Sequence, residues 1–170
     1  PTAETVVQAI QAAQAVLPAG TAAELAFYGG SFTAIPAQEQ EALLAAAAPF
    51  IHSGALSGIR ISTRPDAITQ PILDRLRRAQ VQTIELGSQS MLDAVLQQSG
   101  RGHTAQDTVN AAGQIRENGF RLILQMMTGL PGDSPDGAME TARRMIALQP
   151  DGVRIYPTVI IRDTPLYEQW

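Results

Sequence analysis

The stretch FRLILQMMTGLPGD, residues 120–133, decides the fold class of this chain. Residues 120–127 form a near-continuous apolar strand, a pattern expected where helices cover both faces of a sheet. We expect Met126 and Met127 to belong to the core. A loop with two glycines follows, and a serine, a proline and an aspartate then open a helix over residues 134–148. A buried strand followed by a helix is the repeating unit of parallel α/β proteins.

The rest of the chain repeats this alternation. Strands are expected at residues 24–28, 58–62, 81–86, 120–127 and 152–161. Helices are expected at residues 5–17, 36–48, 69–79, 91–98, 104–118 and 134–148. Thr69 is a candidate cap, Thr104 with Asp107 resembles a capping box, and Gly119 suits the position just after a helix. The order predicts one domain over residues 1–170, with a parallel sheet and helices outside it.

Five strands do not close an eight-stranded barrel. A partial barrel or an open doubly wound sheet must expose an edge at each end of this segment. The helix at residues 5–17 has no preceding strand, so we expect an upstream strand to be missing. The chain also begins at Pro1 rather than methionine, and we expect a trimmed fragment.

Composition narrows the possible functions. The 170 residues carry a net charge of −4, so this segment has no basic footprint for nucleic acid. There is no apolar run near the ~20 residues of a membrane span and no signal-peptide pattern, which predicts a cytoplasmic protein that does not bind membranes. The sequence contains no cysteine, which excludes disulfides and thiolate metal sites within it.

Polar or glycine-rich motifs stand where the five strands should end. In order they are Tyr28-Gly29-Gly30-Ser31-Phe32-Thr33, Ser62-Thr63-Arg64-Pro65-Asp66, Glu85-Leu86-Gly87-Ser88-Gln89-Ser90, Gly129-Leu130-Pro131-Gly132-Asp133 and Arg154-Ile155-Tyr156-Pro157-Thr158. In parallel α/β proteins the carboxyl ends of strands form the rim on which ligands sit. The motifs therefore predict one shared site.

The first two motifs allow both a ligand contact and plain structure. Gly29 and Gly30 lack β-carbons, so a ligand can approach the backbone closely, although a simple turn explains them equally well. Ser62 and Thr63 point to opposite sides of their strand, so one of them can face the mouth of the barrel.

The same ambiguity holds for three residues further along the chain. Glu85 could accept hydrogen bonds from ribose hydroxyls, or pair with Arg60 or Arg64 as a structural acid. Arg101 suits bidentate capture of a carboxylate, although a loop arginine is more often solvated. His103 could act as an acid–base group, or it could belong to the entry of the next helix.

Taken together and in this order, the motifs resemble those of the radical S-adenosylmethionine superfamily. They are most similar to the radical domain of the Elongator catalytic subunit and its short bacterial relatives. Gly100-Arg101-Gly102-His103-Thr104 is a sixth motif of the same pattern, and the likeness runs from about Leu25 to Trp170. It implies a six-stranded partial (βα) barrel, part of a TIM barrel. This chain would hold strands two to six, with the first strand and the cluster loop missing.

The resemblance implies roles for residues at the methionine end of the cofactor. Gly29, Gly30 and Ser31 match the stretch that binds the methionine amino group. Arg101 matches the arginine that holds the methionine carboxylate.

Further residues are implied at the nucleoside end. Ser62 falls where related coproporphyrinogen oxidases carry a ribose-binding glutamate, and Gln89 matches a glutamine near the ribose. Gln125 occupies a strand position where those relatives use aspartate. Leu130 and Pro131 would then lie near the adenine.

The superfamily also binds a 4Fe–4S cluster through three cysteines, none of which occurs in this sequence. The resemblance implies a longer parent enzyme that cleaves S-adenosylmethionine reductively to methionine and a 5′-deoxyadenosyl radical. Its electrons would come from a donor such as flavodoxin or ferredoxin. The Elongator likeness suggests tRNA or another nucleoside as the substrate, and we expect the segment alone to be inactive.

Two alternatives stay open at this stage. A non-radical (βα)-barrel lyase would use a Schiff-base lysine or a metal triad, but the chain has no lysine and only two histidines, His52 and His103. A non-catalytic scaffold would keep the fold and lack the cluster. Closely spaced cysteines shortly before Pro1 in the full-length gene would favour the enzyme over the scaffold.

Overall fold

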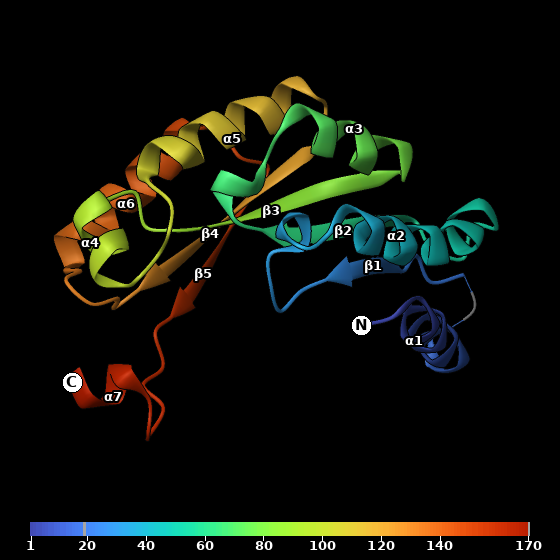
Figure 1. Cartoon of the computed structure of the whole chain (residues 1–170), viewed down its shortest axis with the longest axis horizontal. Helices are drawn as coiled ribbons and strands as arrows, with labels where there is room; N and C mark the ends of the chain where they lie inside the picture. Colours follow the sequence, from blue (N-terminus) through green and yellow to red (C-terminus); the bar gives the residue numbers. More distant parts are fainter. Residues whose placement is uncertain (19, 170) are drawn as a thin grey trace.

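Five parallel strands form one curled sheet. The computed structural model describes residues 1–18 and 20–169. The strands are β1 (Glu24–Phe27), β2 (Gly58–Thr63), β3 (Val81–Gln89), β4 (Arg121–Thr128) and β5 (Gly152–Pro157). They lie side by side in chain order, each pairing in parallel with the next (Figure 1). The predicted α/β partial barrel is confirmed: the sheet is a half-barrel with β1 and β5 at its two edges.

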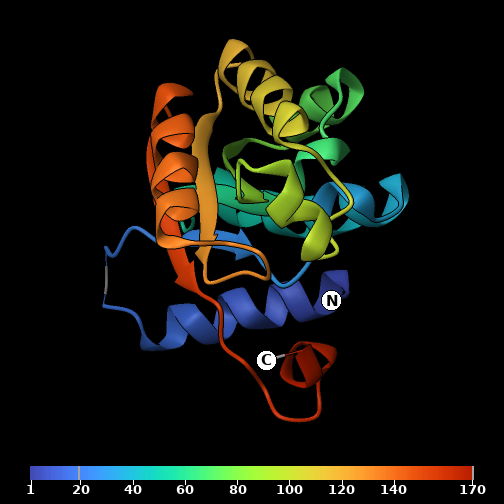
Figure 2. The ribbon, with the colours of Figure 1, turned by 90° about the vertical axis from the view of Figure 1, so that its left-hand side faces the viewer.

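Helices follow the strands as the alternation predicts. They are α1 (Ala3–Val16), α2 (Ala37–His52), α3 (Gln70–Arg78), α4 (Asp93–Gln98), α5 (Ala105–Glu117), α6 (Pro135–Ala147) and α7 (Pro165–Gln169), with 3-10 turns η1 (Phe32–Ala34) and η2 (Pro65–Ala67). In both views α3 and α5 lie above the strands, whereas α1 and α7 lie below them (Figure 2). None of the helices in the described ranges is long and apolar enough to cross a membrane.

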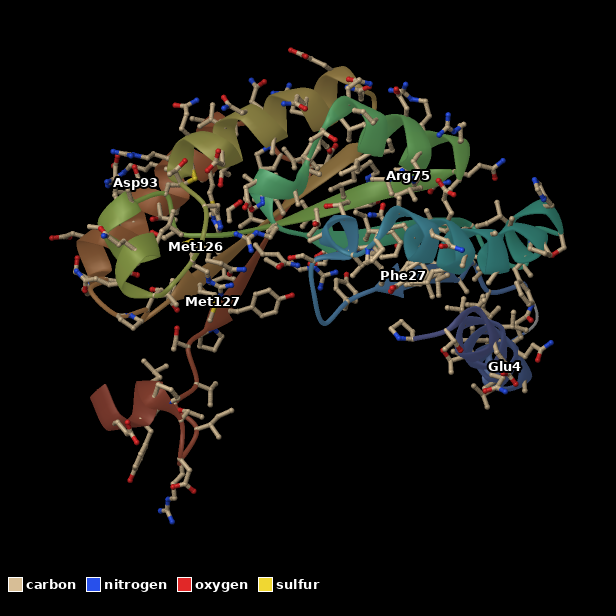
Figure 3. All side chains as sticks on the ribbon, in the orientation of Figure 1. Glu4, Phe27, Arg75, Asp93, Met126 and Met127 are labelled. Atoms are coloured by element: carbon tan, nitrogen blue, oxygen red, sulfur yellow. The ribbon has the colours of Figure 1, made fainter. Side chains whose placement is uncertain are left out.

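The core lies between the sheet and the helices packed on its outer face. Alternate residues of each strand point to opposite faces, so one set of side chains enters the core and the other lines the inside of the half-barrel. The fully buried members include Ile59, Ile61, Ile84, Leu86, Leu122 and Leu124 from the strands and Leu73, Leu76, Ile115 and Met145 from the helices. Met126 on β4 is buried as predicted, whereas Met127 is only partly buried on the opposite face (Figure 3).

Three boundaries differ from the prediction by three residues or more, and others differ by one or two. β3 continues to Gln89 because a register shift against β4, between Leu86 and Gln89, lets the strand carry on past Gly87. β5 ends at Pro157, although the Thr158 N–H still donates to the Thr128 carbonyl of β4 at 2.9 Å. α2 runs past Pro49 to His52, and a hydrogen bond from the Ser53 N–H to the Pro49 carbonyl closes its last turn.

The predicted capping box at the start of α5 is present. The Thr104 hydroxyl accepts a hydrogen bond from the Asp107 N–H at 3.1 Å, and the Asp107 carboxylate accepts one from the Thr104 N–H at 2.7 Å. We expect Thr104→Ala to lower the free energy of unfolding by about 1 kcal/mol in urea titrations. Thr69→Ala is the matched control, because exposed Thr69 occupies the N-cap of α3 without a side-chain cap bond. Equal losses in the two variants would show that the capping box contributes nothing.

Candidate functional site

A polar cavity of about 420 Å³ opens at the carboxyl ends of the strands. Its walls come from the ends of all five strands and from the loop after α4. The lining residues are Tyr28, Gly29, Gly30, Ser31, Ser62, Thr63, Arg64, Gly87, Gln89, Arg101, Gln125 and Tyr156. The structure thus brings together Gly29, Gly30, Ser31, Ser62, Gln89, Arg101 and Gln125, which the sequence placed in one site.

Leu130 and Pro131, the other two predicted residues, line an adjacent groove. This groove has a volume of about 590 Å³ and lies between the loop after α4, the end of β4 and the segment that leads to α7. Arg101 lines both spaces, and Met127 also faces the groove. The groove is the more apolar of the two, so the polar cavity and the apolar groove meet at Arg101.

Gln89 forms the most constrained wall of the cavity. It sits at the end of β3 with φ +64°, in the left-handed region that a residue with a side chain rarely adopts. Only 8% of it is exposed, and its Oε1 has no hydrogen-bond partner in the described part of the chain. A β-carbon at neighbouring Gly87 would come within 3.0 Å of Gln89 Nε2. Strained backbone conformations and buried polar atoms without partners are both found more often at ligand-binding sites than elsewhere.

The opposite wall carries positive charge. Arg101 donates to the Met127 sulfur at 3.4 Å, and no carboxylate pairs with it within residues 1–18 and 20–169. Burial, and then the positive charge of Arg64, hold the pKa of Arg101 below its usual range. Arg64 is itself paired with Asp66 at 2.5 Å. The arrangement leaves Arg101 free to bind an incoming carboxylate.

Ser62 and Thr63 face opposite sides of β2, as expected. The Ser62 hydroxyl accepts a hydrogen bond from Gln125 Nε2 at 3.3 Å inside the half-barrel. Thr63 Oγ1 instead lies 2.6 Å from Thr33 Oγ1 in the packing beneath η1. Ser62 is therefore the member of the pair whose side chain faces the inside of the half-barrel.

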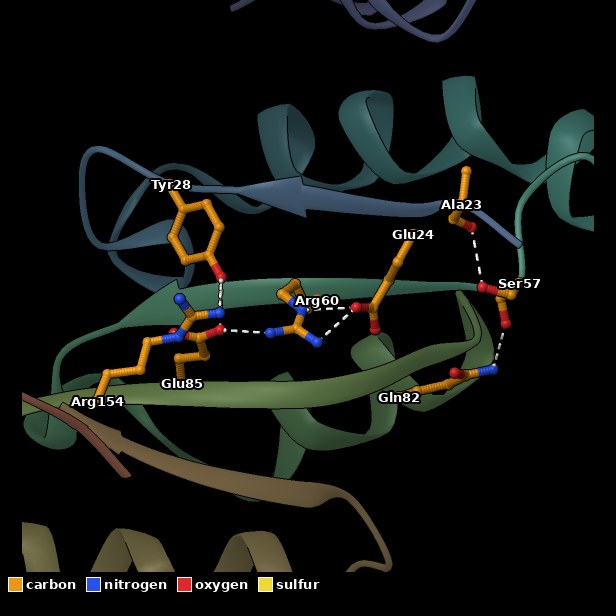
Figure 4. A network of polar contacts seen from close by, with 8 residues as sticks. All are labelled: Ala23, Glu24, Tyr28, Ser57, Arg60, Gln82, Glu85 and Arg154. Atoms are coloured by element: carbon orange, nitrogen blue, oxygen red, sulfur yellow. Dashed lines mark hydrogen bonds and ion pairs between the residues drawn. The ribbon is translucent and has the colours of Figure 1, made fainter. Parts of the chain in front are cut away.

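Below the cavity, groups from four other segments surround the Glu85 carboxylate; Figure 4 shows three of them, Tyr28, Arg60 and Arg154. The carboxylate accepts from the Tyr28 hydroxyl, just after β1, at 2.5 Å, and from Arg60 of β2 at 2.9 Å. Gln125 of β4 donates to its second oxygen at 2.9 Å, and Arg154 Nε of β5 lies 3.1 Å away. Glu85 is fully buried, so all of its charge is balanced by these groups. Of the two sequence interpretations, the structural acid paired with Arg60 is confirmed, and Arg64 is not a partner.

These contacts shift the pKa values of Glu85 and Tyr28. Burial alone would raise the pKa of Glu85, but the hydrogen bonds from Tyr28, Gln125 and Arg60 and the charge of Arg154 outweigh it and lower the pKa. Burial and the hydrogen bond to Glu85 raise the pKa of Tyr28. Glu85 is therefore ionised and Tyr28 is neutral at pH 7.

Sequence reasoning missed the contribution of Arg154 and Tyr28 to this network. Both belong to strand-end motifs, but nothing in their spacing shows that they meet. They are 126 positions apart, and Arg154 Nη2 reaches the Tyr28 hydroxyl at 3.3 Å only because the sheet curls. The sequence did contain one indication: Glu85 is a charged residue within a strand expected to be buried, and a buried charge needs a partner of opposite charge.

His103 belongs to the structure beneath the site. Its Nε2 lies 3.2 Å from the Ser88 carbonyl, a distance that requires Nε2 to carry the hydrogen, and only 7% of the residue is exposed. Burial lowers the pKa of His103, and the nearby charges of Arg101 and Arg64 act in the same direction against that of Asp66. The interpretation of His103 as part of the helix entry fits this position better than an acid–base role.

A pH dependence of stability follows from His103. The unfolded chain takes up a proton near pH 6.5, which the folded state resists, so stability should fall as the pH drops from about 7.5 to 5.5. His103→Gln should weaken this dependence in urea titrations at the two pH values. His52→Gln, at the exposed end of α2, is the matched control and should leave it unchanged. The same slope in all three proteins would contradict the assignment.

Comparison with known proteins identifies the family. A family model described as the Radical SAM superfamily matches residues 1–145. Elongator complex protein 3 of Saccharomyces cerevisiae is 34% identical over 116 residues, which cover 66% of this chain and 21% of that protein. A tRNA uridine(34) acetyltransferase of Methanocaldococcus infernus is 31% identical over 113 residues, covering 65% of this chain and 21% of that protein. The chain thus spans about a fifth of the length of these curated relatives.

Solved structures agree with the sequence relatives. The archaeal Elp3 of Methanocaldococcus infernus superposes with a TM-score of 0.81 at 25% identity, covering 97% of this chain and 43% of that one. Coproporphyrinogen III oxidase from Escherichia coli shares the fold, with a TM-score of 0.70 at 20% identity over 93% of this chain and 37% of that one. The resemblance inferred from the strand-end motifs is confirmed. With a family model that matches most of its length, this chain belongs to the Radical SAM superfamily.

Proposed function

We propose that this chain forms the S-adenosylmethionine-binding wall of a radical SAM enzyme. The observation that carries the proposal is the single cavity that gathers seven of the predicted residues from separate strand ends. Residues so distant in sequence line one space only if the fold brings them there, and a cavity at this rim is the usual ligand site of parallel α/β folds.

The residues present fit the chemistry of the cofactor. Arg101 offers an unpaired guanidinium for the methionine carboxylate. The open backbone of Gly29 and Gly30 offers hydrogen-bonding groups for the amino group. Gln89, with a buried free acceptor, offers a partner for a ribose hydroxyl, and the groove at Leu130 and Pro131 offers apolar surface for the adenine. When bound, S-adenosylmethionine supplies the radical chemistry, while these residues orient it.

The residues present do not fit an iron–sulfur cluster. Cluster iron is held by cysteine thiolates, and the sequence has none. No group of three histidine, aspartate or glutamate residues in the described ranges could hold a metal ion in their place. We therefore propose that the 4Fe–4S ligands lie outside these 170 residues, in a longer parent protein.

The substrate proposal rests on the relatives. Two of them are a tRNA uridine(34) acetyltransferase and Elongator complex protein 3. We propose that the parent modifies a nucleoside in tRNA or a related RNA, with electrons from a donor such as flavodoxin or ferredoxin, in the cytoplasm. The net charge of −4 means that basic surfaces for RNA would have to come from elsewhere in the parent.

Two measurements test the proposal. The first is titration of the 170-residue chain with S-adenosylhomocysteine, followed by NMR; we expect saturable binding with a dissociation constant of roughly 0.1–1 mM, since the cluster is not there to bind the ligand. The second is anaerobic iron–sulfur reconstitution of the full-length gene product and detection of 5′-deoxyadenosine. Binding without product would favour a scaffold. If the chain does not bind S-adenosylhomocysteine and the full-length product forms no 5′-deoxyadenosine, the proposal is wrong.

A further inference from the structure

The Gly29-Gly30 turn has no side chains that could hold it in place. Gly29 adopts φ +93°, a conformation that glycine enters freely and other residues avoid. A β-carbon added to either glycine would meet no atom within 4 Å, so the space beside both α-carbons is open. Two successive glycines have little conformational preference of their own, so the residues on either side of the turn decide its position.

The residue before the turn is anchored firmly. The Tyr28 hydroxyl donates to Glu85 at 2.5 Å and accepts from Arg154 Nη2 at 3.3 Å (Figure 4). The Arg154 guanidinium also lies over the Tyr28 ring, 5.9 Å from its centre. Glu85 cannot follow a movement of Tyr28, because Arg60 and Gln125 hold its two oxygens.

The polypeptide therefore enters the glycine turn from a fixed point. Tyr28 is half exposed through its ring, and it lines the cavity together with both glycines. Its hydroxyl is the only polar atom of its side chain, and that atom donates to Glu85, which is not among the residues that line the cavity. The hydroxyl of Tyr28 can therefore affect ligand binding only through the position of the turn that follows it.

We infer that Tyr28 is a positioning residue, whose hydrogen bond to Glu85 fixes the Gly29-Gly30 turn for the amino-acid end of the ligand. The inference rests on the proposed function, because it names the end of S-adenosylmethionine that Tyr28 serves. The nucleoside end is bound by other elements, Gln89 on β3 and the groove at Pro131. Loss of the tyrosine hydroxyl should therefore affect one half of the ligand and spare the other.

Two probes separate the halves. S-Adenosylhomocysteine carries both the amino acid and the nucleoside, whereas 5′-methylthioadenosine lacks the amino acid. For Tyr28→Phe in the 170-residue chain, we expect about tenfold weaker binding of S-adenosylhomocysteine, as for loss of one strong hydrogen bond. Binding of 5′-methylthioadenosine should stay within about twofold of the unsubstituted chain. Tyr167→Phe, on exposed α7, is the matched control and should change neither affinity.

The outcomes discriminate between the two levels of the argument. If the unsubstituted chain binds neither probe, the proposed function fails and the inference fails with it. If that chain binds both and Tyr28→Phe binds both as tightly, or loses both equally, the positioning role alone is wrong. Partial unfolding of the variant would lower the apparent affinity for both probes by the same factor, so the ratio of the two affinities still decides.

Discussion

Glu85→Gln is expected to lower the free energy of unfolding by about 3 kcal/mol. The substitution keeps the size of the side chain but removes a buried charge and replaces one acceptor oxygen by an NH₂ donor. Tyr28, Arg60 and Gln125 donate to this carboxylate and Arg154 Nε lies 3.1 Å from it, so the new amide must face a donor. Arg154 loses its counterion, whereas Arg60 keeps its ion pair with Glu24. The value lies at the low end for a broken buried pair because Arg154 and Arg60 reach solvent.

Urea unfolding at pH 7 measures the effect, with Glu41→Gln as the matched control. Glu41 also pairs with an arginine, Arg75, at 3.0 Å, but 61% of its side chain is exposed. Exposed pairs contribute at most about 1 kcal/mol. If the free energy of unfolding falls by the same small amount in both variants, the buried Glu85 network stabilises the fold no more than an exposed ion pair does.

Arg101→Ala is expected to weaken binding of S-adenosylhomocysteine by about 1.5–3 kcal/mol, the contribution of hydrogen bonds between charged groups. The reason is that Arg101 offers the cavity an unpaired cation, whereas Arg64 beside it is already paired with Asp66. The affinity for 5′-methylthioadenosine, which has no carboxylate, should change much less. NMR titration of both ligands measures the difference.

Arg143→Ala provides the matched control for charge. Its side chain is 70% exposed on α6, and its nearest carboxylate oxygen, on Glu140, is 3.8 Å away. The control lowers the net charge by the same amount without touching the cavity, so it should leave both affinities unchanged. Equal affinity in Arg101→Ala and the unsubstituted chain would remove Arg101 from the site.

Local rules predicted the elements of this fold because local chemistry determines them. The apolar run at 120–127, the capping box at Thr104 and the turn at Gly119, with φ +79°, all act over a few residues. The end of β3 was predicted wrongly because a distant partner decides it. β3 continues to Gln89 because of its register with β4, which no property of residues 81–86 reveals.

The candidate site was also predicted in part. Motif order predicted which residues meet at the rim, since parallel strands place their carboxyl ends together. Sequence left two partners open for Glu85 and did not anticipate Tyr28 or Arg154. Those contacts depend on how strongly the sheet curls, and curvature is a property of all five strands at once. The left-handed conformation of Gln89 was equally invisible, because only the bulge at Gly87 imposes it.

The contact between Arg154 and Tyr28 also connects the two edges of the half-barrel. β1 and β5 are the free edges of the sheet, and no ladder of backbone hydrogen bonds runs between them in the described structure. Side chains that converge on Glu85 link the ends of these two strands across the half-barrel. A substitution at Tyr28 or Arg154 would remove this link and leave all four strand ladders in place, so the two edges can be uncoupled without changing the sheet.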